Sequence, residues 1–240
     1  MIRTSYIALW VVLSTIVLGV IAIIISFFTR TGNLVHIIAR IWGKGILFVS
    51  GINVTVYGLD NIDPSRSYIY MSNHQSNFDI PVLLACLPVQ FRWLAKAELF
   101  KIPLFGRSMR AAGYVKIDRF NRESAFESIN EAAAKMQNGV SVMIFPEGTR
   151  SRDGKIRAFK KGGFVMAVDS GAPIVPVILQ GTWPIMDKSS LRINAGNVAL
   201  HIEKPIDTSG YTRHTKNDLV ESVRAVICEG FEKEQNGFNR

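Results

Sequence analysis

The first 50 residues differ from the rest of the chain in their hydrophobic pattern. Residues 6–28, YIALWVVLSTIVLGVIAIIISFF, contain no charged side chain and lie between Arg3 and Arg30. A helix that spans a bilayer needs about 20 apolar residues. The apolar core of a cleaved signal peptide has only about 7–15 residues, followed by a small-residue cleavage site. The segment therefore predicts a retained membrane anchor, which either crosses the bilayer or dips in and returns.

The next segment, NLVHIIARIWGKGILFVSG, has an amphipathic pattern. His36, Arg40 and Lys44 recur every four residues among large apolar side chains. This spacing predicts a basic amphipathic helix that lies in the lipid headgroup layer. The alternative is that the helix packs on the protein's own core. Positive charge after the first helix exceeds that before it, which places the remainder in the cytoplasm. We expect residues 1–50 to form the anchor and residues 51–240 a single domain.

After Gly51 the pattern becomes that of a mixed α/β domain, with one sheet and helices on both faces. The expected strands are INVTVYG, SYIYM, FRWLA, VSVMIF, IVPVIL and NVALHIE. VSVMIF is almost wholly apolar, as a buried central strand is. Because proline cannot donate a ladder hydrogen bond, Pro176 inside IVPVIL predicts an edge strand or a bulge.

Three helices are expected in this domain. IPVLLACL is a short apolar helix with Pro81 in its first turn, where proline is tolerated. SAFESINEAAAKMQ predicts a helix that starts with a capping box of Ser124 and Glu127 and stops at Asn138-Gly139. An amphipathic helix from about Asp218 to Glu232 closes the chain.

Composition narrows the classes of partner. The net charge is +9, and the pI is about 9.7 with a mean hydropathy of +0.19. Such a charge implies an anionic partner, which is nucleic acid, an acidic membrane surface or a phosphorylated substrate. The two cysteines, Cys86 and Cys228, give neither a disulfide framework nor a metal-ligand spacing. We therefore expect a reducing compartment and no metal site.

The stretch SNHQSNFDIP places His74 five positions before Asp79. If the helix begins between Asn77 and Ile80, the helix N-terminus stabilises an ionised Asp79. The loop can then fold back so that His74 Nδ1–H donates to Asp79, which leaves Nε2 free as a general base. No G-x-S-x-G elbow supplies a serine nucleophile, so such a base would activate a hydroxyl brought by the substrate. A surface coincidence or a cap-and-loop hydrogen bond would produce the same spacing.

FPEGTRS follows the buried strand VSVMIF, at the end of a strand where open α/β sheets bind ligands. Gly148 allows close approach of the backbone, and Thr149 and Arg150 can donate to phosphate oxygens. Glu147 could position Arg150 or accept a substrate hydroxyl. An ordinary turn with a solvated arginine is the alternative.

Two more cations follow expected strands. Lys96 comes after FRWLA, and Arg119 ends GYVKIDR. Each alone is read as a surface charge. Around an active-site mouth they would form a positive funnel for a phosphorylated lipid.

Four blocks, NHQSNFD, GYVKIDR, FPEGTRS and IVPVILQGT, resemble in order and spacing those of the glycerolipid acyltransferase family, above all its bacterial 1-acyl-glycerol-3-phosphate acyltransferases. The resemblance covers residues 50–210. It implies that His74 and Asp79 form the catalytic pair. The residues that it implies in binding of the glycerol phosphate are Lys96, Arg119, Glu147, Gly148, Thr149 and Arg150.

The resemblance also implies the reaction and the partners. The acyl donor would be a thioester of coenzyme A or acyl carrier protein, with no bound cofactor. The acceptor would be the sn-2 hydroxyl of 1-acyl-glycerol 3-phosphate, and the product would be phosphatidic acid for phospholipid synthesis. The expected location is a bacterial-type inner membrane with the catalytic domain facing the cytoplasm, and nucleic acid is not an expected partner.

Other functions remain open at this point. A sister acyltransferase would use glycerol 3-phosphate, a lyso-ornithine lipid or another lysophospholipid. A basic module that binds membranes or nucleic acid without catalysis would explain the charge, but not His74, Asp79 and Glu147 in these blocks. A lipid hydrolase is disfavoured by the missing serine elbow.

Overall fold

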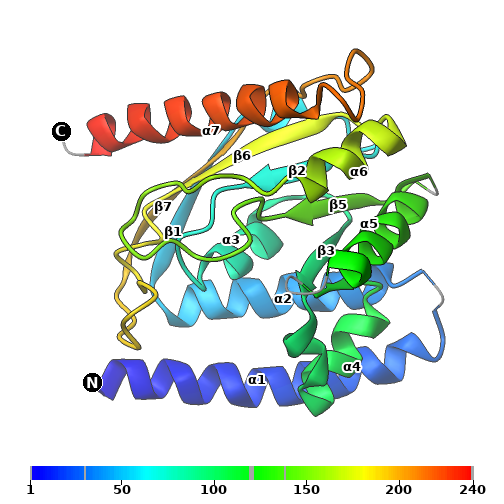
Figure 1. Cartoon of the computed structure of the whole chain (residues 1–240). Coiled ribbons are helices and arrows are strands. Elements are labelled where there is room, and N and C mark those ends of the chain that lie inside the picture. The colour runs from blue at the N-terminus through cyan, green and yellow to red at the C-terminus, as the bar shows by residue number, and fades with distance from the viewer. Residues whose placement is uncertain (1, 30, 119–121, 138, 239–240) are drawn as a thin grey trace.

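The computed structural model describes residues 2–29, 31–118, 122–137 and 139–238, and its centre is a seven-stranded sheet (Figure 1). The order of strands across the sheet is β1-β7-β6-β2-β5-β3-β4. The strands are β1 (Ile52–Tyr57), β2 (Ile69–Ser72), β3 (Phe91–Lys96), β4 (Val115–Ile117), β5 (Ser141–Ile144), β6 (Ile174–Gln180) and β7 (Gly196–Ile202). The α-helices are α1 (Ile2–Ser26), α2 (Asn33–Val49), α3 (Asp79–Cys86), α4 (Pro103–Ala111), α5 (Arg122–Gln137), α6 (Gly162–Ser170) and α7 (Lys216–Phe238), and two 3₁₀ helices span Leu59–Asn61 and Ala97–Lys101.

The direction of the central strands determines where the loops gather. β6 and β2, β2 and β5, and β5 and β3 pair in parallel, whereas β6 and β7 pair antiparallel. The sheet is mixed, as predicted. Because the carboxyl ends of parallel strands meet at one edge, the loops after β2, β3, β5 and β6 lie together there.

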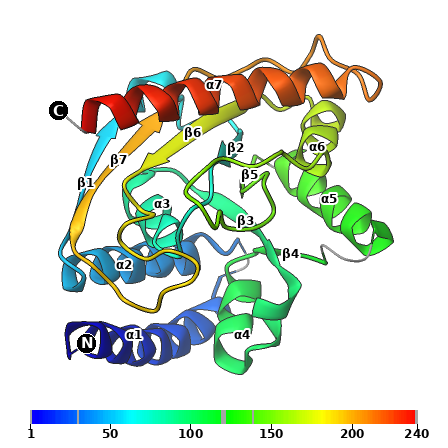
Figure 2. The same cartoon turned by 60° about the vertical axis from the view of Figure 1, so that its left-hand side comes forward.

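Helices cover both faces of the sheet, as predicted (Figure 2). Successive side chains of a strand point to opposite faces. In β2 and the residue before it, Tyr68 and Tyr70 pack with α1, α2 and α3. Ile69 and Met71 pack with α5, α6 and α7. This alternation gives the sheet one hydrophobic core on each face.

The expectation of an edge strand or bulge at Pro176 is wrong. β6 lies between β7 and β2, and all of its residues are buried. The carbonyl of Pro176 accepts a hydrogen bond from the N–H of Glu203, one residue beyond the end of β7. An N–H at position 176 would point toward β7, as this carbonyl does. Because the β6–β7 ladder begins only at Val177, the proline costs the sheet no ladder hydrogen bond.

The predicted helix limits are also partly wrong. α5 begins at Arg122, so Ser124 lies inside the first turn and is not the N-cap of a capping box. The closing helix starts at Lys216 and runs to Phe238, longer than expected. α4 and α6 were not expected from the sequence, and each is only 9 residues long, less than three turns.

The second N-terminal helix packs on the protein's own core, which was the alternative at the sequence level. His36, expected on a basic outer face, is fully buried in α2, and its Nδ1 lies 3.0 Å from the Tyr114 hydroxyl. The opposite side of α2 still exposes large apolar side chains such as Ile41 and Phe48. α2 therefore joins the domain with one side and presents an apolar surface with the other.

α1 lies along the base of the molecule (Figure 1). Within the described residues it is the one helix that is long and apolar enough to cross a membrane, and most of its large side chains are exposed. Hydrogen bonds at several points along α1 hold it to the rest of the protein. Arg3 donates to the carbonyl of Ser50, the N–H of Ile193 donates to Thr4, and Ser108 donates to the carbonyl of Gly19.

Candidate active site

His74 and Asp79 meet at the carboxyl edge of the sheet. His74 lies in the loop after β2, and Asp79 is the first residue of α3. His74 Nδ1 lies 2.7 Å from Asp79 Oδ2, which is the contact expected from the sequence. An aspartate oxygen can only accept from Nδ1–H, so the hydrogen bond selects the tautomer with a free lone pair on Nε2. The histidine side chain borders a cavity and can act on a ligand in it.

The loop between the two residues fixes the carboxylate. The backbone N–H groups of Gln75 and Ser76 also donate to Asp79 Oδ2, at 2.7 and 2.9 Å. These groups lead into the N-terminus of α3, where a negative charge is stabilised. On the other side, the imidazole of His74 stacks on Phe145, with 3.8 Å between ring centroids. The ring is therefore held by a hydrogen bond at its edge and by an aromatic face.

Glu147 lies beneath the histidine loop rather than in the cavity wall. It is 3 % exposed. Its Oε1 accepts the backbone N–H of His74 at 2.7 Å, and its Oε2 accepts that of Arg157 at 2.9 Å. Burial raises the pKa of Glu147 to about 7, partly offset by these two donors. Its carboxylate thus joins three segments of backbone around the site.

Two further contacts fix the main chain of the histidine loop. The carbonyl of His74 accepts the N–H of Ser151 at 2.8 Å. The Asn73 amide makes a two-way pair with the backbone of Leu179 in β6, at 2.8 Å in each direction. Asn73 was not singled out from the sequence, where an asparagine after a strand is an ordinary turn residue.

A cavity of about 770 Å³ opens beside His74. Its walls come from the two N-terminal helices, α1 and α2, and from α3, α4 and β3 of the domain that follows. Most of these side chains are apolar, including Leu18, Ile38, Trp42 and Phe105. The charged residues that border the cavity are Lys96, Arg150, Lys160 and Lys188, and no aspartate or glutamate of the described residues borders it.

Two of the cations expected from the sequence, Lys96 and Arg150, border this cavity. Lys96 borders it and also pairs with Glu98 at 3.2 Å. Arg150 and Thr149 border it without a carboxylate partner among the described residues. Arg119 lies outside the described residues. Lys160 and Lys188 were missed, because neither belongs to a motif and only the shared sheet edge brings them here.

Gly148 is needed for its backbone and for its lack of a side chain. Its φ is +70°, in the left-handed region that glycine adopts at no steric cost. A Cβ atom there would lie 2.9 Å from Cε of Lys160. The glycine therefore gives both the sharp turn and the space for this lysine.

Comparison with known proteins identifies the class. The sequence model of the acyltransferase family matches residues 53–180, and the chain belongs to this family. The resemblance noted from the motifs is confirmed.

Individual relatives are similar over most of this chain. A chloroplastic 1-acyl-sn-glycerol-3-phosphate acyltransferase of Arabidopsis thaliana is 39% identical over 82% of this chain and 54% of its own length. One of Brassica napus is 36% identical over 80% of this chain and 56% of its own length. The chain thus spans about half the length of these two relatives. The crystal structure of the 1-acyl-sn-glycerophosphate acyltransferase PlsC of Thermotoga maritima has a TM-score of 0.83 at 31% identity, covering 98% of this chain and 95% of that one.

Proposed function

We propose that the protein transfers a fatty acyl group from a thioester donor to the sn-2 hydroxyl of 1-acyl-glycerol 3-phosphate, giving phosphatidic acid. The observation that carries the proposal is the His74–Asp79 pair, whose histidine borders a largely apolar cavity together with Arg150 and three lysines. The cavity suits acyl chains, and the cations suit a phosphate. The names of the relatives agree with this substrate.

In the proposed mechanism His74 is the general base. Its Nε2 takes the proton of the sn-2 hydroxyl while the hydroxyl oxygen attacks the thioester carbonyl carbon. Asp79 holds the tautomer and stabilises the imidazolium that forms. The C–S bond then breaks, and His74 returns the proton to the leaving thiolate. No acyl-enzyme intermediate forms, since the hydroxyl attacks the donor directly.

The turn that follows β5 offers donors for the oxyanion. The N–H of Gly148 is engaged with the carbonyl of Phe145 at 3.0 Å. The N–H groups of Thr149 and Arg150 have no acceptor within the described part of the chain. We assign oxyanion stabilisation to these two groups, each worth about 3 kcal/mol by analogy with other acyl-transfer sites.

The remaining motif residues have different proposed roles. Arg150, Thr149 and Lys96 bind the acceptor's phosphate, and Arg119 stays an expectation of the same kind. Glu147 and Gly148 have structural roles in this proposal. Glu147 accepts hydrogen bonds from two loops, and Gly148 adopts the positive φ of the turn. We therefore replace the direct substrate contact expected for Glu147 by a positioning role.

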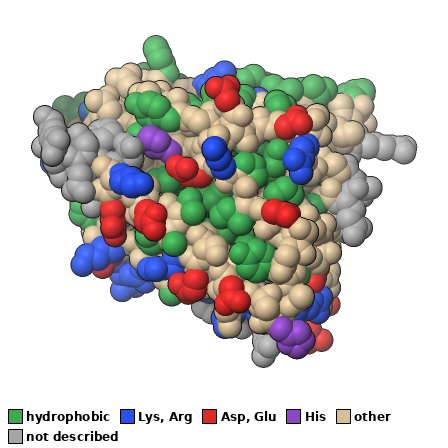
Figure 3. All heavy atoms as spheres, turned by 90° about the horizontal axis from the view of Figure 1, so that it is seen from above, with side chains coloured by type: hydrophobic (Ala, Val, Ile, Leu, Met, Phe, Trp, Pro, Cys, Tyr) green, Lys and Arg blue, Asp and Glu red, His purple; other side chains and the backbone are tan. Residues whose placement is uncertain are grey.

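We propose that residues 1–50 attach the enzyme to the membrane surface while forming part of its cavity. α1 is about 38 Å long at 1.5 Å per residue, yet the domain contacts it at both Thr4 and Gly19. A crossing helix would place these contacts at very different depths and submerge the domain. The opposite face, over α7, mixes acidic and basic side chains as a water-exposed surface does (Figure 3). α1 then lies in the near leaflet, with residues 51–240 in the cytoplasm of a bacterial-type cell.

An acceptor panel with purified protein tests the proposal. With an acyl-coenzyme A or an acyl-carrier-protein donor, we expect 1-acyl-glycerol 3-phosphate to be acylated far faster than glycerol 3-phosphate, lyso-ornithine lipid or lysophosphatidylcholine. Faster acylation of one of the others would assign the enzyme to a sister activity. Acid release without any acceptor at a comparable rate would indicate a hydrolase.

A further inference from the structure

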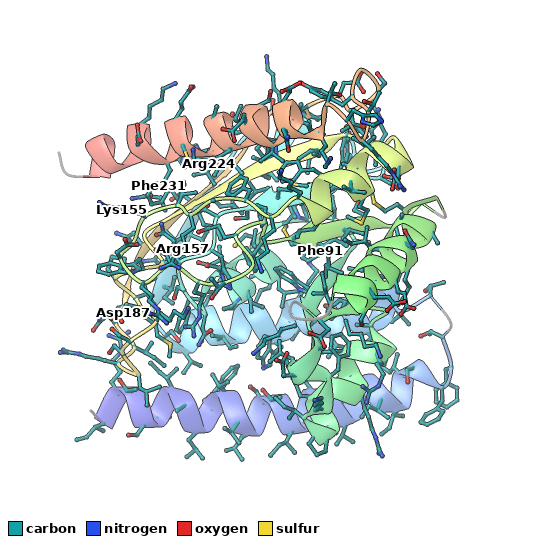
Figure 4. All side chains as sticks on the ribbon, in the orientation of Figure 1. Phe91, Lys155, Arg157, Asp187, Arg224 and Phe231 are labelled. Carbon is teal, nitrogen blue, oxygen red and sulfur yellow. The ribbon has the colours of Figure 1, made fainter. Side chains whose placement is uncertain are left out.

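Lys188 joins the motif residues from a loop that none of the motifs includes. It lies between β6 and β7, and its Nζ donates to Thr149 Oγ1 at 2.9 Å and to the carbonyl of Arg150 at 3.3 Å. The side chain also borders the catalytic cavity. Figure 4 labels Asp187 and Arg157 and shows their two loops on the same side of the molecule.

The charge of Lys188 is not compensated within the described residues. Both of its hydrogen-bond acceptors are neutral oxygens. The adjacent carboxylate of Asp187 accepts the N–H groups of Ser189 and Ser190 in its own turn instead. Desolvation, followed by repulsion from Arg152, Arg150 and Arg157, lowers the pKa of Lys188. An ammonium group has three donors, so one N–H remains for an anion.

The contact with Thr149 also orients a second donor. Because Thr149 Oγ1 accepts from Lys188, the hydroxyl proton must point elsewhere. Arg150 borders the cavity beside it. The three side chains together can present ammonium, hydroxyl and guanidinium donors to the oxygens of one phosphate.

We infer that Lys188 is a ligand of the acceptor's phosphate and selects a phosphate monoester over lysolipids whose phosphate carries a further headgroup. The inference rests on the proposed function. A monoester carries a charge between about −1.5 and −2 at neutral pH, which matches a cluster of cations without a carboxylate. A phosphodiester carries a single charge, and a zwitterionic headgroup would bring another cation against Lys188, Arg150 and Lys160.

Steady-state kinetics of Lys188→Met tests the inference, with Lys188→Arg as the conservative variant. Loss of a charged hydrogen bond is worth about 1.5–3 kcal/mol, so KM for 1-acyl-glycerol 3-phosphate should rise about 10- to 100-fold. The kcat and the donor's KM should change less than about threefold. Lys188→Arg should recover most of the affinity. The preference for this acceptor over lysophosphatidylcholine should fall at least about tenfold in Lys188→Met.

The control is Lys155→Met, at an exposed lysine of the neighbouring loop that does not border the cavity, and it should behave as wild type. A loss of kcat shared by all acceptors would reduce Lys188 to a support of the turn and overturn the inference. A rise in the donor's KM would assign it to the donor and also overturn it. If the wild type does not acylate 1-acyl-glycerol 3-phosphate, the proposed function fails, whereas an unchanged acceptor KM in Lys188→Met defeats the Lys188 assignment alone.

Discussion

The backbone N–H of His74 donates to Glu147 Oε1 across 2.7 Å, although the two residues are 73 positions apart in the chain. The other oxygen of the same carboxylate accepts from Arg157. A buried glutamate thus connects the histidine loop, the turn after β5 and the basic loop that follows this turn. The distance between proposed base and proposed phosphate ligands depends on this carboxylate.

Glu147 should make the stability of the protein depend on pH. Its pKa is raised from the usual 4.5 to about 7 by burial. Between these values the folded state binds more protons than the unfolded state, so stability falls as pH rises from about 4.5 through 7. The loss attributable to this group is at most about 3 kcal/mol.

The measurement is the thermal unfolding midpoint in detergent at pH 5 and pH 8, for wild type and Glu147→Gln. The wild-type midpoint should fall more between these two pH values than that of the variant, which has no carboxyl to titrate. An equal change in both proteins would show that Glu147 does not titrate in this range.

Gly148→Ala should reduce activity because it displaces Lys160 at the cavity, and not only because it strains the backbone. The alanine Cβ would press on the side chain of Lys160 and occupy a positive φ. Gly171→Ala is the matched control, because its φ is +65° but nothing lies within 4 Å of the added atom. Left-handed alanine costs about 1–2 kcal/mol in either variant. We expect similar losses of stability, with kcat/KM at least tenfold lower for Gly148→Ala alone. Equal activities of the two variants would show that the close approach of Lys160 to Gly148 does not matter for catalysis.

Arg150→Ala should mainly weaken binding of the acceptor. We expect KM for 1-acyl-glycerol 3-phosphate to rise about 10- to 100-fold, as for loss of a charged hydrogen bond, with a smaller change in kcat. Arg152→Ala is the control, since Arg152 is exposed and does not border the cavity. Initial-rate kinetics at saturating donor gives both parameters. An equal effect of the two substitutions would point to long-range attraction by net charge instead of a phosphate contact.

Several features of the fold could be predicted because they depend on local sequence. Alternation in INVTVYG and the apolar run VSVMIF identify strands, and Asp79 at the start of α3 follows from the pattern of the helix. The His74–Asp79 contact could also be foreseen, since both ends of a short loop lead to one helix N-terminus.

Other features depend on neighbours that are distant in sequence. Pro176 suits a central strand only because β7 ends beside it. The spacing of His36 with Arg40 and Lys44 resembles a polar face, but Tyr114 supplies a partner inside the core. Lys188 approaches Thr149 only because β5 and β6 both lead to the same edge of the sheet. No local pattern records these contacts.

The most direct test of the central claim is the turnover number of His74→Ala with 1-acyl-glycerol 3-phosphate and a saturating acyl thioester, with circular dichroism to verify the fold. General base catalysis contributes roughly 10²–10⁴-fold. The account predicts that kcat falls by a factor within this range or larger while the fold is retained. A folded His74→Ala protein that turns over at nearly the wild-type rate would contradict it.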